Sequence, residues 1–160
     1  MPRDFAFVQT APDRVFVGWG PFEQLPFRRP ERPAFYVTDF FLDDVHPWRH
    51  PAQWEELSFA ELVERFQDDG EPEVEWATPA LADFAPLFES AQAAMREGEL
   101  QKIVPVLFEN GRFTKRGDWW HAFFSRLVSL PPGLRAYGYS YHNRGLIGAT
   151  PEVLFQAEAH

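Results

Sequence analysis

The chain has 160 residues, which is enough for about one domain. It carries 15 Lys and Arg against 24 Asp and Glu, so its formal charge is −9. This acidity argues against binding to a phosphate backbone, which requires clustered basic residues. The absence of cysteine excludes a disulfide scaffold, a thiolate metal site and a Cys nucleophile. With 27 aromatic residues, the chain is expected to fold rather than to be disordered.

The N-terminus has no uninterrupted apolar run of the kind found in signal peptides, and no stretch approaches the length of a transmembrane helix. We therefore expect a cytoplasmic protein that binds neither membrane nor nucleic acid. An aromatic surface that stacks single-stranded nucleic acid is a weaker alternative, because the net charge opposes it.

The first third of the chain is expected to consist of strands and loops. Short β-prone runs at residues 5–8 and 15–19 flank a turn at residues 11–14. The Pro- and Arg-rich segment 21–33 is expected to be an irregular loop, and residues 34–41 form another predicted strand.

A helix is predicted to begin at Ser58. Ser58 and Glu61 form an S-x-x-E capping box, and Leu57 and Leu62 occupy the positions of a hydrophobic staple. The acidic segment 68–75 ends this helix, as a solvated loop or as a boundary between two parts of the chain. The apolar face of the helix comprises Phe59, Leu62, Val63 and Phe66.

A second amphipathic helix is predicted before Gly98, which is well placed to terminate it. Residues 100–108 are mostly apolar and predict a buried strand, and Asn110-Gly111 predicts a hairpin turn after it. The apolar stripe of the helix comprises Phe84, Leu87, Phe88, Ala91 and Met95.

A third helix is predicted after Asp118, which could cap it. The alternating tyrosines at residues 137–141 predict a strand, and further strands are expected at residues 146–149 and 153–155. The elements together predict an α+β fold with mainly antiparallel sheets and packed helices.

Two residues could carry chemistry. A desolvated Lys102 could act as a general base, and Glu152 in a partly apolar site could act as a general acid. When each residue is considered alone, the simpler interpretation of Lys102 is an exposed lysine at a strand end. The simpler interpretation of Glu152 is a turn residue. Gly148 and Ala149, just before Glu152, would allow a ligand to approach the backbone closely.

Considered together, these positions resemble the chorismate-utilising enzymes. Gly98-Glu99-Leu100-Gln101-Lys102-Ile103-Val104, with the helix before it, is similar to that family's first conserved block. Leu146-Ile147-Gly148-Ala149-Thr150-Pro151-Glu152-Val153-Leu154 resembles the second block, G-[AS]-[ST]-P-E-x-L. The resemblance covers residues 80–156, and Glu152 follows Lys102 by 50 residues, a separation that agrees with the family.

The resemblance implies a function. Lys at position 102 is typical of the isochorismate and salicylate synthase branch, where it activates a water that attacks chorismate. Anthranilate and aminodeoxychorismate synthases typically have Gln there. Glu152 would protonate the departing hydroxyl, and Gly148, Ala149 and Thr150 are the expected substrate-binding residues. The chain would thus be an isochorismate-synthase-like isomerase that serves menaquinone or siderophore synthesis.

The resemblance also implies the domain organisation. Residues 1–79 would be a variable N-terminal segment, and residues 80–160 the first part of a chorismate-binding domain with an α/β/β/α sandwich. We expect the chain to be an incomplete fragment, inactive alone, that pairs with itself or with the missing half. The family requires Mg²⁺, but the ligands are expected outside this chain, and none of its residues is assigned to a metal.

The chain departs from the family pattern at Pro105, where the family's strand commonly continues. Two alternatives to the isochorismate synthase therefore stay open. The chain could be a truncated or degenerate member that binds without catalysis, or a component of an anthranilate or aminodeoxychorismate synthase.

Overall fold

The computed structural model describes residues 4–39, 41–77, 81–106, 108–115, 117–142 and 144–151. The chain divides into two compact units: Met1–Gly70 with Asp118–His160, and Glu71–Gly117. The boundary after Gly70 falls within the acidic segment 68–75. The division between residues 79 and 80, which the family resemblance implies, stays a prediction.

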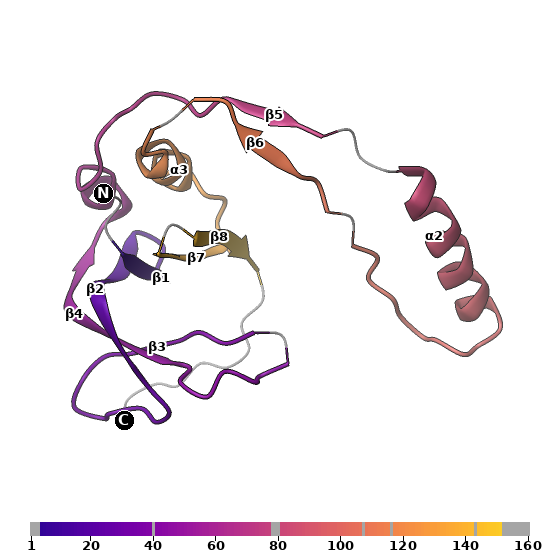
Figure 1. Ribbon diagram of the computed structural model, residues 1–160, viewed down its shortest axis with the longest axis horizontal. Helices are drawn as coiled ribbons and strands as arrows, with labels where there is room; N and C mark the ends of the chain where they lie inside the picture. Colours follow the sequence, from indigo (N-terminus) through magenta and orange to yellow (C-terminus); the bar gives the residue numbers. More distant parts are fainter. Residues whose placement is uncertain are drawn as a thin grey trace. The chain divides into compact units, whose positions relative to one another are not determined.

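The first unit contains a six-stranded antiparallel sheet in the order β3-β4-β2-β1-β7-β8, together with helices α1 and α3 (Figure 1). This architecture confirms the predicted α+β class with mainly antiparallel strands. The strands are β1 (Phe5–Ala11), β2 (Arg14–Leu25), β3 (Phe35–Tyr36), β4 (Trp48–Leu57), β7 (Arg135–Tyr141) and β8 (Arg144–Thr150). The helices are α1 (Phe59–Val63) and α3 (Trp120–Leu127).

The hydrophobic core lies between one face of this sheet and the two helices. The register pairs Phe5 with Trp19 and Phe7 with Val17, so alternate residues of β1 and β2 share that face. Phe124 of α3 is fully buried against them, with its ring centroid 5.1 Å from that of Phe7. The buried cluster comprises Phe5, Phe7, Val15, Val17, Trp19, Leu57, Phe59, Leu62, Phe124 and Ala136.

The buried amide of Gln9 extends the pairing of β1 with β7. The Ala136 N–H donates to Gln9 Oε1 at 2.9 Å, and Gln9 Nε2 donates to the Pro12 carbonyl at 3.0 Å. Both hydrogen bonds satisfy groups that would otherwise be costly to bury.

The helix that begins at Ser58 has the predicted capping box. Ser58 Oγ accepts from the Glu61 N–H at 3.2 Å, and the Ser58 N–H donates to the Glu61 carboxylate at 2.7 Å. The helix α1 ends at Val63, so it is shorter than the predicted helix, whose apolar face extended to Phe66. Phe66, beyond its end, still packs against the core.

The start of α3 differs by one residue from the prediction. Trp119 is the N-cap residue and makes no capping bond through its side chain. Asp118 nevertheless accepts the Trp120 N–H at 3.2 Å, so its carboxylate satisfies one of the free amides of the first turn.

The opposite face of the sheet is partly covered by the segment around β3. The Phe35 ring lies against Gly18, where a Cβ atom would stand only 2.5 Å from it. A side chain larger than hydrogen at position 18 would therefore displace Phe35. The strand predicted over residues 34–41 is confined to Phe35–Tyr36, so most of that prediction is wrong for the described residues.

Strand β4 and the second half of β2 were not predicted. The prolines at positions 21 and 51 and the expected loop 21–33 suggested irregular structure, but β2 continues to Leu25 and pairs with β4 down to Trp48. The pairing shifts its register between Trp19 and Phe22. This irregularity accommodates Pro21, which cannot donate to a ladder.

The second unit contains α2 (Leu81–Arg96) and a two-stranded ribbon of β5 (Val74–Trp76) and β6 (Gly111–Phe113). Gly98 follows the helix with a φ of +78°, so its predicted terminating role is confirmed. The stripe of α2 is not a buried core face, because Leu87 is 70% exposed.

The buried strand predicted over residues 100–108 is wrong. The described residues of this segment form no strand, and Val104 and Phe108 are 69% and 81% exposed. Pro105 removes one ladder donor, and the described part of the chain provides no partner strand. The predicted hairpin at Asn110-Gly111 is also wrong, because Gly111 begins β6, whose partner is β5.

Strand β8 confirms the prediction for residues 146–149, whereas the strand expected at residues 153–155 lies outside the described residues. None of the described helices combines the length and the apolar character needed to cross a membrane.

Candidate functional site

Lys102 lies in the second unit, four residues after the glycine that follows α2. Its backbone is in an irregular segment and its side chain is exposed. The order of elements that the family's first block implies, a helix terminated by Gly98 and then Lys102, is present. The strand that the family's first block implies at Lys102 is absent, because residues 101–106 are irregular.

Gly148, Ala149 and Thr150 lie in the first unit, in the last part of β8. Gly148 pairs with Tyr137 of β7, and a Cβ atom at position 148 would stand 3.0 Å from the tyrosine hydroxyl. The space that Gly148 leaves is thus taken by the Tyr137 ring. The predicted role of these three residues in binding substrate stays a prediction.

Glu152 lies outside the described residues. Lys102 belongs to the second unit, whereas the Gly148–Thr150 segment that precedes Glu152 belongs to the first. The structure does not test the proposed pairing of Lys102 with Glu152. It remains a prediction from the sequence.

The predicted Mg²⁺ can be tested against the donor groups of the chain. The described residues contain no group of three or more His, Asp or Glu side chains placed to hold a metal ion. The described part of the chain therefore does not fit a Mg²⁺ site, and the ligands expected outside this chain stay a prediction.

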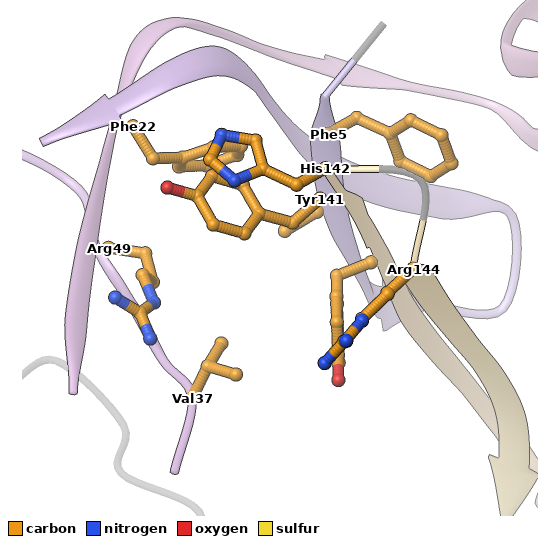
Figure 2. A pocket seen from close by; sticks show the side chains of 9 residues that line it. Phe5, Phe22, Val37, Arg49, Tyr141, His142 and Arg144 are labelled. Carbon is orange, nitrogen blue, oxygen red and sulfur yellow. The ribbon is translucent and has the colours of Figure 1, made fainter. Parts of the chain in front are cut away.

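The sequence did not predict the pocket on the β3 side of the sheet. This pocket has a volume of about 500 Å³ and lies where the β7–β8 hairpin approaches β2 and β4 (Figure 2). Its walls combine aromatic and cationic side chains. The residues that line it are Phe5, Ala6, Phe22, Val37, Arg49, Tyr139, Tyr141, His142 and Arg144.

A polar network fixes one wall of this pocket. Gln24 Nε2 donates to the Tyr141 hydroxyl at 2.5 Å, and Arg49 donates to the Gln24 side-chain oxygen. Arg49 also forms an ion pair with Asp44 at 2.7 Å, and its guanidinium carbon lies 6.0 Å from the centre of the Tyr141 ring. The Arg49 side chain is only 18% exposed, so these contacts hold it in place.

The β7–β8 turn forms the second wall. His142 has a left-handed φ of 48°, and its ring stacks on Tyr141 with the centroids 4.0 Å apart. The His142 N–H donates to Asp4 at 3.1 Å. Alternating tyrosines predicted the strand β7, but no local pattern indicated that Arg49 and Arg144 would both line a pocket beside it.

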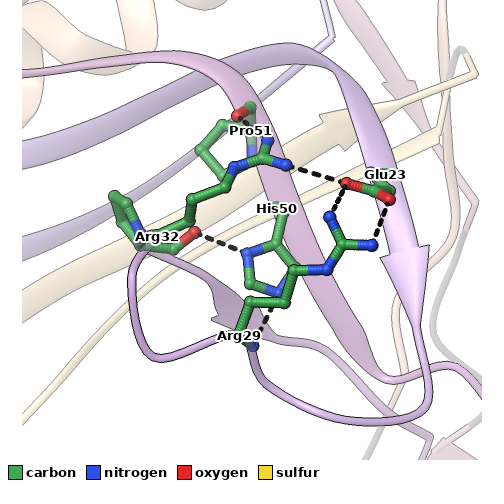
Figure 3. Close-up of polar contacts among 6 residues, drawn as sticks. Glu23, Arg29, Arg32, His50 and Pro51 are labelled. Carbon is green, nitrogen blue, oxygen red and sulfur yellow. Dashed lines mark hydrogen bonds and ion pairs between the residues drawn. The ribbon is translucent and has the colours of Figure 1, made fainter.

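A second polar cluster surrounds the fully buried His50 (Figure 3). The Arg29 N–H can only donate, so His50 Nε2 accepts from it at 3.3 Å. His50 Nδ1 then carries the proton and donates to the Pro33 carbonyl at 3.0 Å. Glu23 pairs with both Arg29 and Arg32, at 3.0 and 2.8 Å. Because both ring nitrogens of His50 are occupied, this cluster holds a loop in place and offers no free ligand group.

No protein-family model, curated protein or solved structure matches this chain.

Proposed function

We propose that the chain is part of an isochorismate-synthase-like enzyme that converts chorismate to isochorismate. Lys102 takes a proton from the incoming water, and Glu152 gives a proton to the departing ring hydroxyl. One water enters and one leaves, so the reaction is an isomerisation. It needs a base and an acid on opposite sides of the ring.

The observation that carries the proposal is the pair of sequence blocks, in the family's order and separation. Two structural features support it. The helix α2 ends at a left-handed Gly98 just before Lys102, and the β7–β8 hairpin leads directly into the Thr150-Pro151-Glu152 segment. Lys102 is exposed in the structure, so the proposed role requires its side chain to be shielded from water when substrate is bound.

The test is an assay of the protein as its own gene encodes it, with chorismate and with or without Mg²⁺. We expect isochorismate as product, and we expect Lys102→Ala and Glu152→Gln each to lower kcat/KM by about 10²- to 10⁴-fold. Lys115→Ala is the matched control, since Lys115 is the other lysine of the chain, and it should leave the rate unchanged.

Other outcomes would support the alternatives. Unchanged isochorismate formation by Lys102→Ala would contradict the role of Lys102 as base. An aminated product formed only with an amine donor would instead indicate an anthranilate or aminodeoxychorismate synthase component. Chorismate binding by calorimetry without any turnover would indicate a non-catalytic binding module.

A further inference from the structure

The pocket beside the β7–β8 hairpin contains more positive than negative charge among the side chains that line it. Arg49 and Arg144 are both lining residues, and no Asp or Glu is among them. Asp44 lies next to the pocket, where it is paired with Arg49. Asp4, at the other end, accepts the backbone N–H of His142.

Arg144 differs from Arg49 in its surroundings. It is exposed at the start of β8, and within the described part of the chain its guanidinium has no carboxylate partner. In Figure 2 Arg144 and Arg49 stand on opposite sides of the pocket, with Val37 between them. A guanidinium that has no carboxylate partner among the described residues is well suited to bind the carboxylate of a ligand.

The rest of the lining is apolar and contains several rings. Phe22 and Tyr141 stand with their centroids 6.4 Å apart at 76°, and Val37 lies across the pocket. A volume of about 500 Å³ is in the range of pockets that bind small organic ligands. Aromatic walls of this kind favour a planar ring as the ligand body.

We propose that this pocket binds a small aromatic carboxylate, with its ring against Phe22 and Tyr141 and its carboxylate on Arg144. An aromatic amino acid is a poorer fit. Its ammonium group would need an acidic partner in the lining, and Asp44 is already engaged by Arg49. The inference goes beyond the proposed function and does not depend on it.

The test is calorimetric titration of the chain with benzoate at low ionic strength. We expect saturable binding with one site, and we expect Arg144→Gln to weaken it about tenfold. The matched control is Arg126→Gln, the same change on α3, which lies on the other face of the sheet, and it should leave the affinity unchanged. Because Arg144 is exposed, its replacement should not disturb folding, which circular dichroism would check.

Comparison ligands test separately the roles of the carboxylate charge, the aromatic ring and the absence of an ammonium group. Benzamide, which keeps the ring and lacks the charge, should bind at least tenfold more weakly than benzoate. Inorganic phosphate binding as tightly as benzoate would overturn the role of the aromatic walls. Phenylalanine binding as tightly as benzoate would overturn the exclusion of an ammonium group. Equal benzoate affinity in Arg144→Gln and the unchanged chain, or no saturable binding at all, would overturn the proposal.

Discussion

His50 contributes to the fold through two hydrogen bonds that the sequence does not reveal. The sequence places it between two prolines, Pro47 and Pro51, which disfavour regular pairing in a sheet. In the structure it is a buried residue of β4 that holds the backbone of a distant loop at Arg29 and Pro33. Such long-range pairing depends on the chain path, which local patterns do not encode.

We predict that His50→Leu destabilises the first unit by about 2–4 kcal/mol, because the partly buried hydrogen bonds to the Arg29 N–H and the Pro33 carbonyl would be lost. Urea denaturation would measure the loss. His46→Leu is the control, since His46 is exposed in the same stretch, and its effect should stay within about 0.5 kcal/mol. Equal effects of the two changes would show that the buried hydrogen bonds of His50 contribute little.

At the scale of secondary structure, the sequence predicted best where one local mechanism decides the conformation. The capping box at Ser58, the left-handed Gly98 and the tyrosine alternation in β7 are all confirmed. The errors occurred where a strand depends on a distant partner. The apolar segment 100–108 has no partner strand among the described residues, whereas β4, with two prolines near one end, pairs along most of β2.

The capping box predicts a pH dependence. Hydrogen bonds from the Ser58 N–H and hydroxyl to the Glu61 carboxylate lower the pKa of Glu61 below its ordinary value of 4.5. A lowered pKa in the folded state adds stability above the unfolded value, and this stability is lost as the pH falls through the folded pKa.

Glu61→Gln should therefore reduce the loss of stability on acidification below about pH 4.5, as followed by urea denaturation at several pH values. Gln can still accept the Ser58 N–H, so the effect at neutral pH should be small. Glu64→Gln, just after the same helix and outside the capping box, should leave the acid dependence unchanged. If both variants lose stability on acidification in parallel, the capping carboxylate does not contribute to it.

At the scale of the whole molecule, the sequence predicted the fold class, whereas the candidate site stays a prediction. The resemblance to the chorismate-utilising enzymes implied roles for Lys102 and the Gly148–Thr150 segment, which fall in two separate units. The pocket beside the β7–β8 hairpin was missed because its lining residues come from several strands that are distant in the sequence. Its two arginines, for example, lie in β4 and β8, which are also far apart in the strand order. Sheet pairing, rather than any motif, forms that pocket.

The central claim is that the protein adds water to chorismate. The most direct measurement is to supply chorismate to the protein encoded by the full gene in water enriched in ¹⁸O and to analyse the product by mass spectrometry. We expect isochorismate that carries one ¹⁸O atom from solvent and whose formation is lost in Lys102→Ala. A product without solvent oxygen, or labelled isochorismate formed equally well by Lys102→Ala, would contradict it.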